Sequence, residues 1–162
     1  MKKKVKKFSY PEEITETFDD ANFHIKYCLG FIRNYLSGDV LEIGAGCGSF
    51  TRNYFGKKEI SSLTLTERDK KNILTLSAKF KKFRKIKVFN GLINQVKKKY
   101  NAILYLHVLE HIKNDNKEIN DAVKKLKKNG FLIILAPAHN KMYSKLDKVV
   151  GHYRRYELPF FQ

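Results

Sequence analysis

The chain has 162 residues, of which 43% are hydrophobic and 13% aromatic, a composition that excludes a disordered chain and fits a single globular domain. Its formal charge of +17 invites comparison with proteins that bind nucleic acid or anionic membranes. However, 27 of the 33 cationic residues are lysines, spread over nearly every predicted helix, whereas geometric recognition of phosphate favours arginine. We therefore expect a solvated lysine-rich surface, without a firm nucleic-acid signal.

Cysteine usage and the N-terminus bear on metal content and on location. Cys28 and Cys47 are far apart and form no Cys-x-x-Cys pair, so neither a disulfide framework nor a zinc site is indicated and no metal is expected. A reduced, cytoplasmic setting fits best. No apolar run approaches the length of a membrane span, and the basic start lacks the apolar stretch of a signal peptide. We expect residues 1–13 to form a mobile basic tail and residues 14–162 to form one domain.

The first half of the chain alternates helix and strand patterns. Between residues 14 and 36 apolar side chains recur every three or four positions, which predicts a helix. A short buried strand at residues 40–43 leads into a glycine-rich loop, and residues 49–55 are expected to form a helix that closes at Gly56. A second strand is predicted at residues 61–67.

A third helix follows the second strand. Asp69 can cap its N-terminus, because a short acidic side chain accepts hydrogen bonds from the first free N–H groups of a helix. Ile73, Leu76 and Phe80 share one face of this helix. A third strand is then predicted at residues 85–90.

The second half repeats the alternation. A fourth strand at residues 102–106 precedes His107, and Asp115 with Glu118 has the spacing of a capping pair at the head of another helix. That helix is expected to continue through Leu126 and to stop at the pair formed by Asn129 and Gly130. The next eight residues, FLIILAPA, predict a fifth strand that is apolar on both faces.

This order of elements predicts an α/β fold. We expect a Rossmann-like, doubly wound, mostly parallel sheet of five strands in the order 3-2-1-4-5, with helices on both faces and right-handed crossovers. In such sheets ligands bind beyond the carboxyl ends of the strands, where the strand order reverses. The glycines and the polar residues that follow the strands meet at that edge: Gly44, Gly46, Gly48, Glu67, Asn90, His107, Glu110 and His111.

The glycine loop helps to identify the class of ligand. Its pattern, Gly-x-Gly-x-Gly, differs from the dinucleotide fingerprint Gly-x-Gly-x-x-Gly and lacks the Lys-Ser or Lys-Thr pair of a phosphate loop. Glu67 suits the two hydroxyls of a ribose, because a carboxylate accepts from both. A nicotinamide enzyme needs the same group, so Glu67 alone does not distinguish the two classes.

Four stretches of sequence, in this order and spacing, resemble a class I S-adenosylmethionine-dependent methyltransferase. They are VLEIGAGCGSFT from Val40, LTLTERD from Leu63, LYLHVLEHIKNDNKEI from Leu104 and LIILAPAHNKMYSKLDKVVGHYRRY from Leu132. The likeness is greatest to a bacterial group with a PAH…D…GHYRRY segment after the fifth strand. It extends from about the first helix to the last residues, and the combination is far more specific than the glycine loop.

The resemblance implies S-adenosylmethionine as the cofactor. Backbone amides of the glycine loop would face its methionine part, and Glu67 would hold its ribose. Asn90 stands where such enzymes usually have an aspartate near the adenine, and His107 stands where the group often has an acidic residue. The cofactor-binding residues that the resemblance implies are Glu42, Gly44, Ala45, Gly46, Gly48, Glu67, Arg68, Asn90, Gly91 and His107.

Methyl transfer from a sulfonium needs an aligned acceptor and, for a hydroxyl, a base. Imidazoles titrate near neutral pH, so the candidate catalytic residues are His107, His111 and His152, with His107 first by position; a structural role for each is equally open. The segment after the fifth strand would bind the acceptor through His139, Arg154, Arg155 and Tyr156. Because paired arginines suit anions, a small-molecule, sugar or lipid-linked acceptor with negative charge is expected.

Similar methyltransferases continue with another helix and two more strands, whereas this sequence ends at ELPFFQ. The usual last two strands are therefore expected to be missing, which would leave the fifth strand as an uncovered apolar edge. We expect a dimer or another partner at that edge, or else a fragment of a longer protein.

Other functions stay open at this point. One is a shortened S-adenosylmethionine-binding module that turns over little and acts through a partner or as a dimer. An RNA methyltransferase is suggested only by the charge, and no RNA-binding module is visible. A nicotinamide oxidoreductase is disfavoured by the glycine spacing.

Overall fold

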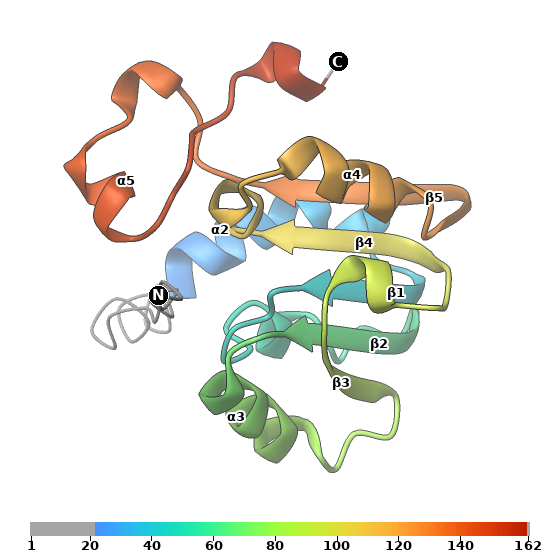
Figure 1. Cartoon of the computed structure of the whole chain (residues 1–162). Coiled ribbons are helices and arrows are strands. Elements are labelled where there is room, and N and C mark those ends of the chain that lie inside the picture. The colour runs from blue at the N-terminus through green and yellow to red at the C-terminus, as the bar shows by residue number, and fades with distance from the viewer. Residues whose placement is uncertain (1–21, 162) are drawn as a thin grey trace, which may run out of the picture.

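The computed structural model describes residues 22–161, so the predicted tail and the first predicted helical residues, 14–21, lie outside the described part. Its centre is a five-stranded sheet in the order β3-β2-β1-β4-β5, in which every strand pair is parallel (Figure 1). The predicted Rossmann-like topology is confirmed. The strands are β1 Gly38–Ile43, β2 Ile60–Glu67, β3 Ile86–Asn90, β4 Tyr100–Leu106 and β5 Leu126–Leu135.

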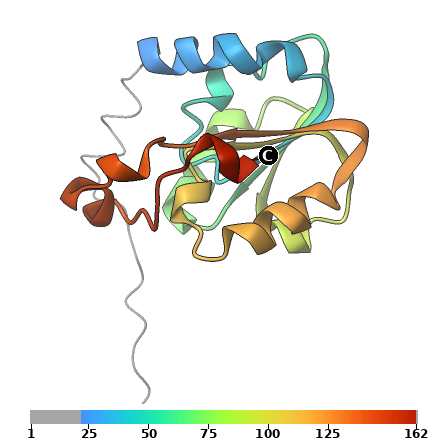
Figure 2. The same cartoon turned by 90° about the horizontal axis from the view of Figure 1, so that it is seen from above.

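Helices cover both faces of the sheet. The described helices are α2 Asn22–Ile32, α3 Lys70–Phe80, α4 Asp115–Val123 and α5 Lys145–Val149. Figure 2 shows α2 and α4 on opposite sides of the sheet, while α5 belongs to a segment beyond the carboxyl ends of the strands. No helix within residues 22–161 is long and apolar enough to cross a bilayer.

Alternating side chains of the central strands pack into two hydrophobic cores, one on each face of the sheet. Val40 of β1 packs into one core with residues of α2 and α3, while its neighbour Leu41 packs into the other with Ala122 of α4. In β4, Leu104 and Ile103 divide between the same two cores. Both faces of β4 are therefore buried, which explains why the sequence of this strand is continuously apolar.

The predicted helix at residues 49–55 is wrong. The structure has a single 3₁₀ turn there, η2 Thr51–Asn53. Side chains of Thr51 and Tyr54 turn inward and donate hydrogen bonds to the buried carboxylate of Glu42, at 2.6 and 2.5 Å. A buried carboxylate needs such donors, and this requirement outweighs the weak helical preference of a segment so short.

The predicted boundaries around α4 also differ from the structure. Asn114, and not Asp115, caps the helix, accepting from the N–H of Lys117 at 3.2 Å. Leu126 belongs to β5, and Asn129 sits at φ 60° within that strand, where the β4–β5 register shifts. The Asn-Gly pair therefore makes a bulge in a strand and does not end a helix.

Strand β5 forms one edge of the sheet, and within the described residues β4 is the strand that pairs with it. Beyond its end, residue Ala138 forms an isolated parallel bridge with Tyr156, so the C-terminal segment returns to the extension of β5. Phe131 on β5 is 47% exposed, and its ring lies 5.0 Å from that of Tyr35.

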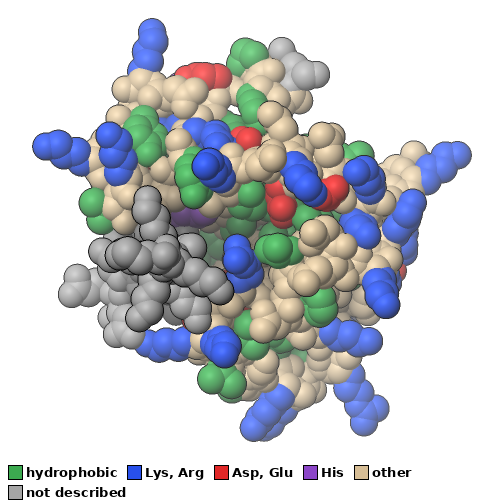
Figure 3. All heavy atoms as spheres, viewed as in Figure 1, with side chains coloured by type: hydrophobic (Ala, Val, Ile, Leu, Met, Phe, Trp, Pro, Cys, Tyr) green, Lys and Arg blue, Asp and Glu red, His purple; other side chains and the backbone are tan. Residues whose placement is uncertain are grey.

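Cationic side chains are dispersed over the face of the molecule shown in Figure 3. In Figure 3, Lys and Arg project from many parts of the visible face, between exposed apolar side chains, rather than gathering over one element. This distribution is the one expected of a solvated lysine-rich surface.

Candidate functional site

The loop after β1 turns with the help of left-handed glycines. Gly44 and Gly46 have φ values of 65° and 56°, a region that other residues adopt only with strain. A Cβ on Gly44 would lie 2.8 Å from Val108, whereas a Cβ on Gly46 would meet nothing within 4 Å. The loop is thus packed at Gly44 and open at Gly46, where a ligand can approach the main chain.

The end of β2 is tied to this loop, as the strand order predicts. The N–H of Gly46 donates to Oε2 of Glu67 at 2.8 Å, and the N–H of Ala45 donates to the carbonyl of Thr66 at 2.9 Å. Oε1 of Glu67 accepts from the N–H groups of Arg68 and Asp69, at 2.6 and 2.9 Å. The carboxylate is therefore held in place, and its remaining lone-pair site, on Oε2, can accept a ligand hydroxyl.

The end of β3 lies beside Glu67. Asn90 is the register partner of Glu67 in the parallel β2–β3 pair, and its side chain is exposed. Gly91 follows directly, half-buried between Phe89 and Gln95. The predicted ribose and adenine positions are therefore adjacent on one edge of the sheet.

Glu42 lies beneath the loop. It is 2% exposed, and burial raises the pKa of its carboxyl to about 7, although hydrogen bonds from Thr51 and Tyr54 favour the ionised form. These contacts show Glu42 holding the loop from inside. Its predicted contact with the methionine part of the cofactor stays a prediction.

His107 follows β4 with a strained backbone, at φ 57°. Its N–H donates to the carbonyl of Leu135 at 2.8 Å, and its Nδ1 lies 3.6 Å from Oε1 of Glu110. On the other side its Nε2 is 3.3 Å from Nε2 of His24 in α2, and its ring centroid is 6.0 Å from that of Phe50. Sequence reasoning missed His24, because a lone histidine on a helix gives no sign of what it faces.

His111 and His152, the other two predicted catalytic residues, contact each other with ring centroids 4.6 Å apart. Nδ1 of His111 lies 3.3 Å from the carbonyl oxygen of Gly151, and Nδ1 of His152 lies 3.0 Å from Oδ1 of Asp147. Burial lowers the pKa of His111. Asp147, which is 2% exposed, is a further residue that sequence reasoning did not assign, although it stands between the two halves of the PAH…D…GHYRRY segment.

Arg154 and Arg155 form ion pairs with carboxylates of the same chain. Arg154 pairs with Asp115 at 2.6 Å and donates to the carbonyls of Ile112 and Lys113. Arg155 binds both oxygens of Asp147, at 2.9 and 3.0 Å, which holds the pKa of that carboxyl well below its usual range.

Tyr156 is 5% exposed and donates to Oδ2 of Asp115 at 3.0 Å. Together with the two arginine pairs, this contact favours a structural role for residues 154–156 over the predicted contact with an anionic acceptor. Asp115, predicted as a helix cap, is the carboxylate that joins Arg154 and Tyr156.

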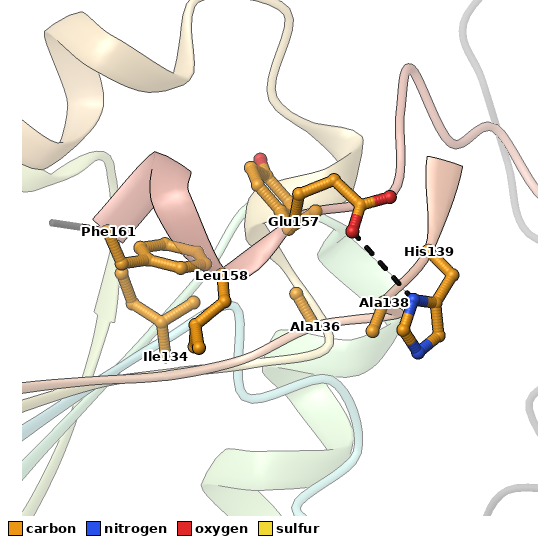
Figure 4. Close-up of a pocket in the computed structure, with 8 residues that line it drawn as sticks. Ile134, Ala136, Ala138, His139, Glu157, Leu158 and Phe161 are labelled. Atoms are coloured by element: carbon orange, nitrogen blue, oxygen red, sulfur yellow. Dashed lines mark ion pairs between the residues drawn. The ribbon is translucent and has the colours of Figure 1, made fainter. Parts of the chain in front are cut away.

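His139 lies at the mouth of a pocket of about 320 Å³ near the end of β5 (Figure 4). It is exposed, has φ 64°, and its Nδ1 lies 3.8 Å from Glu157. The other lining residues are mostly apolar: Ile134, Ala136, Ala138, Tyr156, Leu158 and Phe161. The pocket lies beside the edge strand, and the N–H of His139 donates to the carbonyl of Tyr156 at 3.0 Å, so His139 contacts another of the predicted substrate residues.

The sequence was compared with models of known protein families, and one family matches over most of the chain. Residues 11–160 match a family model described as a methyltransferase domain. A search of curated proteins gives no match.

Solved structures of similar fold include three of relevance. N-methyltransferase NodS from Bradyrhizobium japonicum, in complex with S-adenosylhomocysteine, is 19% identical with a TM-score of 0.65, covering 84% of this chain and 68% of its own. YcgJ from Bacillus subtilis is 18% identical with a TM-score of 0.67, covering 85% and 65%. Coclaurine N-methyltransferase, bound to N-methylheliamine and S-adenosylhomocysteine, is 19% identical with a TM-score of 0.61, covering 72% and 36%. The chain thus spans between about a third and two thirds of the length of these proteins.

Proposed function

The chain belongs to the methyltransferase domain family, and from this premise we propose that it binds S-adenosylmethionine and transfers the methyl group to a small-molecule, sugar or lipid-linked acceptor. The observation that carries the proposal is the hydrogen bond between Gly46 and Glu67. The N–H of this left-handed glycine, which is open to a ligand, lies 2.8 Å from Oε2 of a carboxylate that is held in place. Two neighbours with the same fold hold S-adenosylhomocysteine, which supports this cofactor.

The residues at the edge fit the cofactor. Side-chain-free backbone at Gly46 allows a ligand to approach, and Oε2 of Glu67 keeps one acceptor site for a ribose hydroxyl. Asn90, next to Glu67 in register, offers an amide for hydrogen bonds with a base. When bound, S-adenosylmethionine would supply an electrophilic methyl group.

The remaining task of the chain is to hold the acceptor and to take its proton. β4 pairs with β1, so His107 and the glycine loop flank the point at which strand order reverses. His107 is half-buried beside His24 and Phe50, and its position at this edge makes it the candidate base for the proton of an acceptor hydroxyl. Coclaurine N-methyltransferase is bound to a small amine, which supports a small-molecule acceptor.

Replacing Glu67 tests the proposal. Titration calorimetry with S-adenosylmethionine and with S-adenosylhomocysteine should show one site, and Glu67→Ala should weaken binding about 10- to 100-fold, the worth of hydrogen bonds to a charged group. Glu59→Ala is the matched control, since Glu59 directly precedes the opposite end of the same strand with its side chain 59% exposed. Its affinity should equal that of the wild type.

The outcome for the wild type decides between functions. Absence of heat and of any thermal shift with either adenosyl compound would contradict cofactor binding. Binding without methyl release from S-adenosylmethionine in the presence of cell extract would favour the alternative, a binding module with little turnover. Heat with NAD in place of the adenosyl compounds would favour an oxidoreductase.

A further inference from the structure

Three potential metal ligands meet where two distant segments of the chain cross. Glu110 and His111 belong to the 3₁₀ turn η4 Leu109–His111 after β4, and His152 follows α5. One ligand atom from each side chain lies within 4.8 Å of the other two. We propose that Glu110, His111 and His152 bind one divalent transition-metal ion.

Glu110 carries the argument. It is 1% exposed, and neither carboxylate oxygen has a hydrogen-bond partner among the residues that the structure describes. A buried ionised carboxylate without partners is costly, and native proteins compensate such groups with donors, cations or metals. The nearest imidazole on the β4 side, Nδ1 of His107, is 3.6 Å away, beyond hydrogen-bond distance. A bound cation would supply the missing charge.

Both histidines are oriented as metal ligands usually are. Nδ1 of His152 lies 3.0 Å from Oδ1 of Asp147, and Nδ1 of His111 lies 3.3 Å from the carbonyl oxygen of Gly151. Oxygen acceptors require the proton on Nδ1, which leaves the lone pair of each ring on Nε2. Carboxylate and carbonyl partners of this kind fix the ring and strengthen it as a ligand.

The position of His152 is held by several contacts. Its N–H donates to the carbonyl of Asp147 at 2.8 Å, and the N–H of the next residue, Tyr153, donates to the carbonyl of Glu110 at 2.8 Å. Arg155 binds the same Asp147 carboxylate through two nitrogens. The segment that delivers His152 is therefore fastened directly to the turn that delivers Glu110 and His111.

The donor set indicates the class of metal. Two imidazoles with one carboxylate suit Zn²⁺, Co²⁺, Fe²⁺ or Ni²⁺ better than Mg²⁺ or Ca²⁺, which prefer oxygen ligands. Ligand distances of about 2.0–2.2 Å require the three groups to draw together slightly. Three protein ligands leave at least one position open, for water or for an oxygen of a bound molecule. The absence of a cysteine pair, which led to the expectation of no metal, has no bearing on such a set.

The location gives the ion a possible use. Glu110 is three residues beyond His107, in the turn that follows β4, at the edge where the cofactor site is proposed. An ion with an open position there would bind an acceptor oxygen and lower the pKa of a hydroxyl. This use rests on the proposed function, whereas metal binding itself does not.

The first experiment uses the full chain after removal of any histidine tag and dialysis against a chelator. Titration calorimetry with Zn²⁺ and the visible absorption of added Co²⁺ should both saturate at one equivalent. Mg²⁺ should give a much weaker response. Cofactor binding is measured separately with S-adenosylhomocysteine, so failure of the metal site and failure of the cofactor site are distinguishable.

Variants assign the ligands. Glu110→Gln and His152→Asn should each weaken Zn²⁺ binding at least about tenfold and change the Co²⁺ spectrum, as expected for loss of a ligand. Asp147→Asn, which removes an orienting partner, should weaken binding by about 10- to 100-fold. His139→Gln is the matched control, since this exposed histidine lies outside the cluster, and it should leave both readouts unchanged.

Three results would overturn the proposal. These are no saturable Zn²⁺ or Co²⁺ binding by the wild type, equal binding by a folded Glu110→Gln variant, and loss of binding in His139→Gln. Should Glu110→Gln fail to fold, the stoichiometry and Co²⁺ spectrum of the wild type, with His152→Asn, still decide the question.

Discussion

Two buried carboxylates near the edge of the sheet have opposite surroundings. Glu42 accepts hydrogen bonds from Thr51 and Tyr54, while Glu110 has no hydrogen-bond partner in the described part of the chain. The Glu42 carboxylate therefore receives its hydrogen bonds from the chain itself, and the remaining free-energy cost of burying it is electrostatic. The second has imidazoles near it but no hydrogen bond, which is the physical basis of the proposed metal site.

The raised pKa of Glu42 predicts that stability depends on pH. Because its folded pKa is about 7 against an ordinary 4.5, the folded state binds more protons between these values. Stability contributed by this group should therefore fall as pH rises through that window, by about 3 kcal/mol in total.

Glu42→Gln isolates this effect. Urea unfolding at about pH 5 and about pH 8 should show the wild type losing more stability than the variant, since an amide does not ionise. Any pH-independent cost of the amide cancels in this comparison. Equal pH dependence of both proteins would contradict the assignment to Glu42.

At the scale of elements, buried ion pairs fasten the segment after β5 to the sheet. Asp115 at the head of α4, which is 6% exposed, receives Arg154 at 2.6 Å and the hydroxyl of Tyr156 at 3.0 Å. Asp147 receives Arg155 and His152 within the segment itself. Arg154 therefore ties the segment to α4, and Arg155 holds together the segment itself.

Asp115→Ala should lower the free energy of unfolding by about 2 kcal/mol, because it leaves a partly buried guanidinium unpaired. Tyr156→Phe, which removes one hydroxyl from the same network, should cost about 1 kcal/mol. Chemical denaturation measures both. Asp121→Ala on the same helix, whose lysine partners are mostly exposed, should have a much smaller effect. A large loss in Asp121→Ala, or none in Asp115→Ala, would contradict this structural role.

The strands could be predicted from sequence because β1 and β4 are buried on both faces and their apolar runs are unambiguous. Asp69 was predicted correctly as the cap of α3, since capping is local. Asp115 was not, because a distant arginine outweighs a local preference. The residues of the edge were brought together by strand order alone, whereas the contacts of His24, Asp147 and Glu110 arise from chain crossings that no local pattern encodes.

For the whole molecule, the edge at β5 is the feature that bears on assembly. Phe131 and Tyr35 are 47% and 46% exposed there, and the strand pairs within the described residues only with β4. Unpaired edges with exposed aromatic residues favour association with another chain. A dimer, or another partner at this edge, stays a prediction.

Light scattering over a range of concentrations tests it. The wild type should form a dimer that Phe131→Lys shifts toward the monomer, since a lysine on an edge strand disfavours pairing. Lys87→Ala on the opposite edge strand, β3, is the control and should leave the dimer intact. A wild type that stays monomeric at high concentration would contradict self-association.

The bridge between Ala138 and Tyr156 brings together the two ends of the loop that follows β5, while contacts with Glu110 and Asp115 tie its interior to the rest of the fold. Residues of this loop that make none of these contacts, such as the exposed Lys141 and Lys145, should therefore tolerate substitution without disturbing the pairing of the five strands. The loop is thus fixed at a few anchor residues and open to variation between them.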